Sequence, residues 1–423
     1  MTSPVSNASV LPFEQARASV EDYARSIVPP TTTESVSLLE TLSRVLVDPV
    51  VADRDLPAFD RSTRDGFAVR AADVAKVPVK LHCVAELKAG DSHEKFARAL
   101  AAGECVEIMT GAAVPQGADA VVMVEYTSRN GEQVEITRTI AKGENVVARA
   151  AEATKGQVLL ERGTRVNHAV VALAATTGTR RNLRVYTRPT IAILSTGDEI
   201  VDVESTPQPH QIRNSNSFSL AAQIVRAGGE PRILPIAVDE PRRLAALIEE
   251  GLSADLLLIT GGVSMGKYDF VEQVLAQFDN HVFFNGALIQ PGKPVVFLDA
   301  CRKDSAKRVP VFGLPGNPVS TMVTFDLFVR PVVDALCGAV LRPLRFVQAT
   351  LSTEVKAKTG LTRFLPAQLS GEGQQTRVGL TRWQGSGDVV SVARSNCYIV
   401  IPPDRETIAA GESVSILLPG AEL

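Results

Sequence analysis

The stretch Ile191-Ala192-Ile193-Leu194-Ser195-Thr196-Gly197-Asp198-Glu199 decides the fold of this chain. Four consecutive apolar residues predict a buried strand, and the glycine and two acids that follow predict a turn. The pattern returns in Leu256-Leu257-Leu258-Ile259-Thr260-Gly261-Gly262 and in Val309-Pro310-Val311-Phe312-Gly313-Leu314-Pro315-Gly316-Asn317-Pro318. In an open α/β sheet such turns meet at the carboxyl ends of the strands, where ligands bind. We therefore expect the functional site at this edge of a sheet.

Strand and helix patterns alternate on both sides of these stretches, from about residue 188 to residue 335. Strands are predicted at 190–194, 232–238, 256–259, 294–298 and 309–312, and helices at 216–227, 241–250, 270–278 and from Pro318. Such alternation is typical of a parallel, doubly wound sheet with right-handed crossovers. The central part of the chain is thus predicted to be an α/β domain.

The segments on either side of this α/β domain show different patterns of apolar and turn residues. Apolar residues at helical spacing predict a helix at 13–28 and a shorter one at 35–46, and residues 157–187 look partly helical. Short alternating runs with Gly and Pro turns predict β structure from about 50 to 142 and again after 340. The fold class is therefore multidomain, α/β plus β.

Composition excludes several classes of protein. With 423 residues the chain is long enough for about three domains. The net charge of -3 and the scattered basic residues argue against a nucleic-acid partner. No apolar run is long enough to span a membrane, and the first residues lack a basic signal region, so we expect a cytoplasmic protein. Five dispersed cysteines and five dispersed histidines predict neither disulfides nor a zinc site.

The turns after the strands carry acids, glycines and one lysine. Asp198 and Glu199 are suited to Mg²⁺ beside a phosphate, and Gly261 and Gly262 can present backbone N–H groups to an oxyanion. Asn317 and Pro318 fit the N-cap and first position of a helix. Helix capping and a solvated surface lysine are the structural alternatives at these positions. Because no Ser-His or Cys-His pair accompanies the loops, covalent acyl chemistry lacks its parts, and a metal-assisted reaction of an anionic substrate is favoured.

The ordered set of segments resembles the MoeA / gephyrin E-domain family of molybdopterin molybdenumtransferases. The segments that carry the resemblance are DRSTRDGFAVR (60–70), MTGAAVPQGADAVVMVE (109–125), GENVVARAAEATKGQVLLERGTRV (143–166), TIAILSTGDEIV (190–201), QIRNSNSFSL (211–220), DLLLITGGVSMGKYDFV (255–271), QPGKPVVF (290–297), GLPGNPVS (313–320) and GSGDVVSVARSNCYIVIP (385–402). They follow the family's order and cover nearly the whole chain.

The resemblance implies a fold of four parts. Residues 1–50 and 142–187 would form an elongated helical dimerisation domain, and 51–141 an inserted β domain. Residues 188–335 would form a MogA-like α/β domain that carries the active site, and 336–423 a C-terminal β domain. Family likeness also implies a homodimer whose active site is shared between subunits.

The resemblance implies a reaction as well. Molybdate would be inserted into adenylylated molybdopterin with release of AMP, with Mg²⁺ or a similar divalent cation as cofactor. A MogA-like partner and recipient molybdoenzymes are possible further partners. Two alternatives stay open: a MogA-like molybdopterin adenylyltransferase, which would lack the segments at 1–187 and 340–423, and a gephyrin-like peptide-binding scaffold.

The family's functional positions carry over residue by residue. The matching acids are Asp60, Glu199, Asp239 and Asp269, of which Glu199 and Asp269 would hold the metal, and Glu152 takes the catalytic position of a usual aspartate. The matching substrate positions are Thr110, Gly111, Ser195, Thr196, Gly197, Asp198, Gly261, Gly262, Ser264, Lys293, Pro315, Gly316, Asn317, Pro318 and Ser391, with Lys293 and Ser264 assigned to molybdate. The chain departs from the usual family residues at Arg61, Arg64, Glu152, Lys267 and Gln290.

Overall fold

A computed structural model describes residues 9–178, 182–238, 240–262, 270–302, 304–372 and 375–419. The chain forms two compact units. The first comprises Met1–Val47, Gly163–Val171 and Asn182–Leu423, and the second comprises Asp48–Arg162 and Ala172–Arg181. The first unit thus includes both the predicted α/β domain and the predicted C-terminal β domain. The four domain boundaries given above stay a prediction.

A six-stranded sheet in the order β16-β13-β17-β21-β20-β18 forms the centre of the first unit. Its strands are β13 (Thr190–Ser195), β16 (Glu230–Ile233), β17 (Leu256–Thr260), β18 (Asp279–Asn285), β20 (Val296–Cys301) and β21 (Arg308–Leu314). The helices are α3 (Ser215–Ala227), α4 (Pro241–Gly251), α5 (Phe270–Leu275), α6 (Pro318–Thr324) and α7 (Arg330–Leu336), with a π-helical turn at Phe325–Val329 between the last two. Two short strands that follow β13 in the chain, β14 (Ile200–Val201) and β15 (Ile212–Arg213), pair parallel with each other.

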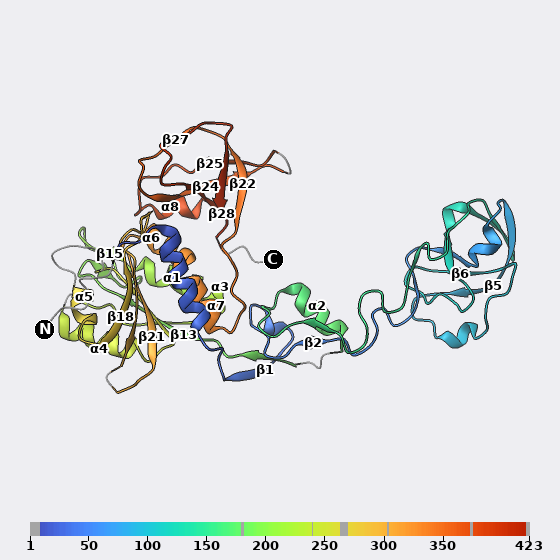
Figure 1. The fold of residues 1–423 in the computed structure, drawn as a ribbon, viewed down its shortest axis with the longest axis horizontal. Coiled ribbons are helices and arrows are strands. Elements are labelled where there is room, and N and C mark those ends of the chain that lie inside the picture. The colour runs from blue at the N-terminus through green and yellow to red at the C-terminus, as the bar shows by residue number, and fades with distance from the viewer. Residues whose placement is uncertain are drawn as a thin grey trace. The chain divides into compact units, whose positions relative to one another are not determined.

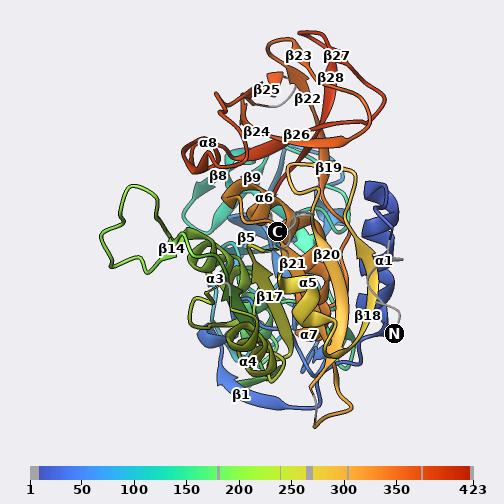
Figure 2. The ribbon, with the colours of Figure 1, turned by 90° about the vertical axis from the view of Figure 1, so that its left-hand side faces the viewer.

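Helices cover both faces of this sheet, because successive residues of a strand point to opposite sides. Ile191 and Ile193 belong to a core that includes α3, α6 and α7, whereas Ala192 and Leu194 belong to a second core with α4 and α5. Figure 2 shows β17, β21, β20 and β18 with helices beside them. The predicted doubly wound α/β architecture is confirmed.

The sheet is mixed rather than wholly parallel. Strands β16, β13, β17 and β21 run parallel, but β20 and β18 are antiparallel to their neighbours. The physical reason is the connection between β20 and β21, which spans only residues 302–307 and contains no helix. Such a short connection can only form a hairpin.

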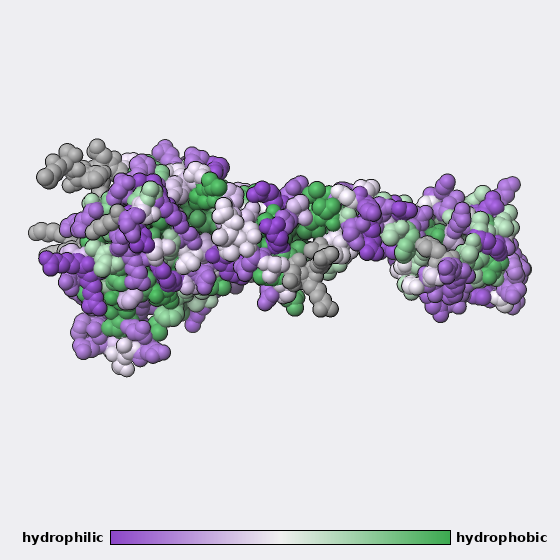
Figure 3. Space-filling model, turned by 90° about the horizontal axis from the view of Figure 1, so that it is seen from below, coloured by the Kyte–Doolittle hydropathy of each residue, from purple (hydrophilic) through white to green (hydrophobic). Residues whose placement is uncertain are grey.

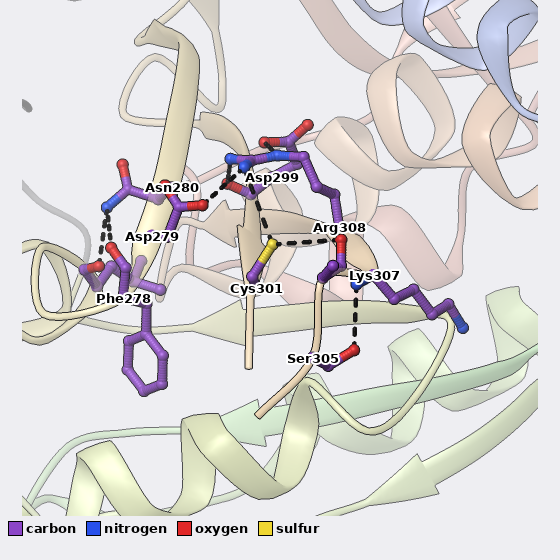
Figure 4. A network of polar contacts seen from close by, with 10 residues as sticks. Phe278, Asp279, Asn280, Asp299, Cys301, Ser305, Lys307 and Arg308 are labelled. Atoms are coloured by element: carbon purple, nitrogen blue, oxygen red, sulfur yellow. Dashed lines mark hydrogen bonds and ion pairs between the residues drawn. The ribbon is translucent and has the colours of Figure 1, made fainter. Parts of the chain in front are cut away.

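Polar contacts fasten this antiparallel edge at the end of the sheet where β21 begins (Figure 4). The Arg308 guanidinium donates to the buried Asp299 carboxylate at 2.7 Å and to Asp279 at 3.1 Å. One arginine thus joins three adjacent strands, because Asp279 begins β18 and Asp299 lies on β20. The network is structural and lies away from the carboxyl ends of β13, β17 and β21.

Helix α1 (Phe13–Ser26) confirms the helix predicted at 13–28, and it packs with Phe328 and Phe364 through Phe13. The helix predicted at 35–46 is wrong. This segment contains β1 (Thr33–Ser37) and a 3-10 turn at Leu39–Thr41, and β1 pairs antiparallel with β12 (Asn182–Tyr186). The ladder to a segment about 150 residues away replaces the local helical preference, which no short-range pattern reveals.

A small β-barrel follows α7, as expected for β texture after residue 340 (Figure 1). Its strands are β19 (Ile289–Gln290), β22 (Phe346–Leu351), β24 (Thr362–Ser370), β25 (Arg377–Leu380), β26 (Cys397–Ile401) and β28 (Ser413–Leu417). Closure comes from β26, which pairs with both β28 and β24. A short pair, β23 (Val355–Lys356) and β27 (Thr407–Ile408), and helix α8 (Val389–Ala393) complete this part.

The second unit is built on a six-stranded sheet in the order β7-β4-β6-β5-β9-β8. These strands are β4 (Gly66–Val69), β5 (Val79–Leu87), β6 (Glu104–Ile108), β7 (Ala120–Met123), β8 (Thr127–Asn130) and β9 (Gln133–Ile136). The remaining elements are β2 (Val50–Val51), β3 (Arg61–Ser62), β10 (Val146–Val147), β11 (Val158–Leu160) and 3-10 turns at Ala71–Val74, His93–Phe96 and Val124–Tyr126. Helix α2 (His168–Thr176) has its first residues in the first unit and the rest in the second. The β structure predicted for residues 50–142 is confirmed.

All five cysteines are free and buried. None of the helices in the described ranges combines the length and the apolar character that a membrane-spanning helix needs.

We predict that Gly66→Ala destabilises the second unit. A Cβ at Gly66 would lie 1.9 Å from the backbone oxygen of Val122, so β4 and β7 must separate. Overpacking of this kind costs about 1–3 kcal/mol, measured by urea denaturation followed by circular dichroism. Gly379→Ala is the matched control, because its Cβ would meet only Ser352 at an ordinary 3.8 Å. Equal stability of the two variants would contradict the prediction.

Candidate active site

The carboxyl ends of three neighbouring parallel strands meet at one edge of the α/β sheet. Ser195 at the end of β13 pairs with Thr260 at the end of β17, which in turn pairs with Leu314 at the end of β21. The loops that follow, together with the start of α3, line a cavity of about 580 Å³. The predicted residues among its walls are Ser195, Thr196, Glu199, Gly261, Gly262, Pro315, Gly316, Asn317 and Pro318.

Glycine is required where these loops touch. Gly261 has a φ of 89°, and a Cβ there would lie 2.3 Å from the backbone oxygen of Thr196. Gly316 lies against Gly261 in turn, since its own Cβ would be 3.5 Å from the Gly261 Cα. A side chain at Gly261 would force the β13 and β17 loops apart. The glycines therefore bring the backbones of the three loops into one wall of the cavity.

Asn216, which our sequence prediction did not single out, ties two of these loops together. Its Nδ2 donates to Thr260 Oγ1 at 2.9 Å and to the Gly316 carbonyl at 2.8 Å. Its Oδ1 is buried and accepts no hydrogen bond. An unsatisfied buried oxygen costs free energy, so a donor on a ligand would find a ready acceptor here. The signal in the sequence was the polar Asn214-Ser215-Asn216 run at the start of a predicted helix.

Ser195 has a positioning role in the described geometry. Its hydroxyl is buried and contacts Asn214 Oδ1 at 3.0 Å and Ser217 Oγ at 2.8 Å. Asn214 is the N-cap of α3 and accepts from Ser217 N. The buried serine thus joins the end of β13 to the first turn of α3 and fixes where Asn216 points.

Glu199 is the exposed carboxylate of the cavity wall. It folds back over Gly197, where a Cβ would lie 2.5 Å from Glu199 Oε2. Gly197, with φ of 143°, therefore leaves room for this carboxylate. Asp198 is also exposed but does not line the cavity.

A second cavity of about 590 Å³ adjoins the first and shares Pro294, Pro315 and Asn317 with it. It contains the exposed Lys293, whose side-chain ammonium forms no polar contact within the part of the chain that the structure describes. Gln290 and two further cations, Lys358 and Arg363, also line it. The sequence analysis missed both cations, because they come from the C-terminal β-barrel and no local motif marks them.

Arg363 is an unusual cation for a structural role. Its side chain is only 7% exposed, its Nη2 donates to the Lys358 carbonyl, and its buried Nε has no hydrogen-bond partner. A guanidinium that keeps an unused donor beside Lys293 favours an oxyanion in this cavity.

Asn317 and Pro318 occupy the N-cap and first position of α6, as predicted, but the Asn317 side chain makes no capping bond. Its exposed carboxamide faces both cavities instead. Ser391 behaves in the opposite way. Its hydroxyl is buried, donates to the Asp388 carbonyl at 2.7 Å, and lines neither cavity. The neighbouring Ser386 lines the second cavity in its place.

The predicted residues of the second unit also gather in one region. Asp60 accepts from the Arg149 N–H at 2.7 Å, and its carbonyl accepts from Val114 N. Glu152 pairs with Arg61 at 3.3 Å at the surface of the unit.

Thr110 and Gly111 follow β6 in the same unit. Thr110 donates from both its N–H and its hydroxyl to Asp65, at 2.7 and 2.8 Å, and these bonds hold the pKa of the Asp65 carboxyl below its usual value. Gly111 N donates to the Ser62 carbonyl at 2.9 Å. The Asp65 contacts therefore fix the Thr110 turn.

Asp239, Ser264 and Asp269 lie outside the described residues, as does Lys267. Within the ranges that the structure covers, no group of three or more His, Cys, Asp or Glu side chains forms a metal site. The described geometry is that of an anion site: backbone of Gly-rich loops, one carboxylate at Glu199, and cations at Lys293 and Arg363.

Three family models match successive parts of the chain. Residues 11–178 match the MoeA N-terminal region (domain I and II), 192–335 match a probable molybdopterin binding domain, and 348–418 match the MoeA C-terminal region (domain IV).

Among its relatives, a molybdopterin molybdenumtransferase of Bacillus subtilis is 35% identical over 398 residues, which cover 91% of this chain and 90% of that protein. A relative of the same name from Nostoc is 35% identical over 396 residues, with 91% and 88% covered. The crystal structure of a molybdopterin biosynthesis moeA protein from Pyrococcus horikoshii OT3 has a TM-score of 0.74 at 28% identity and covers 97% of this chain and 100% of its own. The chain therefore belongs to the MoeA family of molybdopterin molybdenumtransferases.

Proposed function

We propose that this enzyme inserts molybdate into adenylylated molybdopterin and releases AMP, in molybdenum cofactor biosynthesis. The observation that carries the proposal is the pair of adjoining cavities at the strand ends, one with Glu199 and Gly-rich loops, the other with Lys293 and Arg363. An acid beside backbone donors suits a phosphate-bearing substrate, and unpaired cations suit a small oxyanion. The names of the relatives support the same reaction.

Each cavity has a role in this proposal. The first, at about 580 Å³, is in the range of small-molecule sites and would hold the nucleotide and pterin along Gly261, Gly262 and Gly316. The second would hold molybdate against Lys293 and Arg363. The two substrates would then lie on either side of the shared residues Pro294, Pro315 and Asn317. Such proximity replaces an encounter in solution by a prearranged one.

A divalent cation fits the donor set at Glu199. Mg²⁺ keeps several waters and takes one or two carboxylates together with substrate phosphates, so a single described carboxylate at the phosphate cavity is compatible with it. When bound, Mg²⁺ would neutralise charge on the pyrophosphate. Glu199 and Asp269 would hold it.

A homodimer with a shared active site is part of the proposal. Asp60, Thr110 and Glu152 would then act from the second unit of a partner copy. Exposed hydrophobic side chains such as Val28 and Leu39, exposed at 80% and 84%, support association through another surface. Figure 3 shows hydrophobic areas between hydrophilic ones on the visible face.

The substrate and product of the proposed reaction indicate which enzymes act before and after it. The substrate is already adenylylated, so a MogA-like adenylyltransferase must supply it, and molybdoenzymes receive the product. Cytoplasm is the proposed location. An adenylyltransferase or a peptide-binding scaffold is less favoured, because relatives named as molybdenumtransferases match along about nine tenths of their length.

We predict that Glu199→Gln abolishes AMP release from adenylylated molybdopterin in the presence of Mg²⁺ and molybdate. The change keeps the shape of the side chain but removes the charge that would hold the metal. Chromatography of released AMP measures the reaction. Glu204→Gln is the control, since Glu204 is exposed nearby and lines neither cavity. Near-normal AMP release by Glu199→Gln would refute the assigned role.

Lys293→Gln is expected to raise the KM for molybdate about tenfold, because one charge-assisted hydrogen bond is lost. At saturating molybdate the turnover rate of the variant should equal that of the wild type. Lys356→Gln removes the same charge from β23, outside both cavities, and should leave the KM unchanged. An unchanged KM in Lys293→Gln would contradict the location of molybdate.

Mixing two inactive variants tests the shared site. Asp60→Asn and Glu199→Gln should each be inactive alone. In a mixed dimer both lesions fall in one of the two sites, so an exchanged equal mixture should recover roughly a quarter of the wild-type activity. Size-exclusion chromatography checks the dimer. No recovery in a mixture shown to contain mixed dimers would mean that each site uses acids from one subunit.

A further inference from the structure

A third cavity in the first unit shares no lining residue with the two of the active site. Its volume is about 280 Å³. Its walls come from α1, from residues 163–165, from the region of α7, from the connector between α7 and β22, and from the end of β28. Five arginines from four of these segments meet there: Arg17, Arg165, Arg330, Arg342 and Arg345.

Two aspartates also line the cavity, but each already has a cation. Asp334 Oδ1 accepts from Arg165 Nη2 at 2.7 Å and from Arg330 Nε at 3.0 Å. Asp326 is paired with Arg226 at 3.4 Å, and burial raises its pKa to about 6. Arg17, in turn, is paired with Glu21 at 2.6 Å. The acids therefore do not neutralise the remaining arginines.

Arg342 and Arg345 are the uncompensated pair. Both lie on the connector, and neither guanidinium forms a hydrogen bond or ion pair within the residues that the structure describes, although the Arg345 carbonyl accepts from Leu418 N at 3.3 Å. Two unpaired guanidinium groups beside three others repel one another unless an anion lies between them. Arg342 is exposed and Arg345 is half-buried, and the apolar residues Pro331, Leu344 and Leu417 lie among the walls beside them.

The chemistry of the walls indicates the class of ligand. Guanidinium groups match phosphate geometry with pairs of N–H donors, and a phosphate monoester offers about two negative charges on three acceptor oxygens. Two uncompensated arginines balance that charge. A volume of about 280 Å³, near the lower limit of small-molecule pockets, admits only a small organic group beyond the phosphate. We propose that this cavity binds a small phosphate monoester at Arg342 and Arg345, separately from the active site.

Isothermal titration calorimetry with ribose 5-phosphate and with inorganic phosphate tests the proposal on the full-length protein. The wild type should bind ribose 5-phosphate, and Arg342→Gln/Arg345→Gln should weaken this binding at least about tenfold, the loss expected for charge-assisted hydrogen bonds. Turnover with adenylylated molybdopterin should stay unchanged in this variant, because neither arginine lines the active-site cavities. Arg342→Gln alone, at an exposed position, serves if the double variant does not fold.

Two controls assign the binding. Arg377→Gln/Arg382→Gln removes the same charge from the C-terminal β-barrel region without touching the cavity, and Lys293→Gln alters the active site. Both should bind ribose 5-phosphate as the wild type does. Loss in Lys293→Gln with full binding in Arg342→Gln/Arg345→Gln would move the anion to the active site and overturn the proposal. Binding of inorganic phosphate but not of ribose 5-phosphate would overturn the assignment to a monoester.

Discussion

The contact between the strand-end loops is the constraint on which the site depends. Gly261 can approach the Thr196 backbone so closely only because it has no side chain, and Asn216 then joins Thr260 to the Gly316 carbonyl. Loops from β13, β17 and β21 thereby become one surface. Everything assigned to the first cavity, including the direction of the Glu199 carboxylate over Gly197, rests on that surface.

Buried polar atoms without a hydrogen-bond partner occur in the two adjoining cavities and also elsewhere among the described residues, as at Asn280 Oδ1 beside the Arg308 network. The Arg308 guanidinium donates to the Asp299 and Asp279 carboxylates and so stabilises the antiparallel edge of the sheet. Asn216 Oδ1 and Arg363 Nε, in contrast, are buried without partners and belong to the two adjoining cavities. At the two cavities a ligand with suitable groups would complete these hydrogen bonds, because an unsatisfied buried polar atom reduces stability.

Three positions at which the resemblance implies a departure from the family, Arg61, Glu152 and Gln290, lie beside charged side chains in the structure. Arg61 and Glu152, two of the positions at which the resemblance implies a departure, form an ion pair with each other. Gln290 lines the second cavity in place of a lysine, while Lys293, Lys358 and Arg363 keep that cavity cationic. The chain has therefore changed individual contacts and kept the sign of the charge that an oxyanion would meet.

Sequence by itself determined the α/β domain and the edge of the sheet where the site lies, because consecutive apolar residues followed by glycine turns are local signals. It also predicted site roles for Glu199, Gly261, Lys293 and Asn317, which the structure places in the walls of the two adjoining cavities. Only the tertiary structure decided that β20 and β18 run antiparallel, that residues 33–37 form a strand with β12, and that Ser391 is bonded within its own helix. The same holds for Asn216 and Arg363. Their roles arise from pairing and burial between segments far apart in the chain, and no spacing along the sequence records which side chains those contacts bring together.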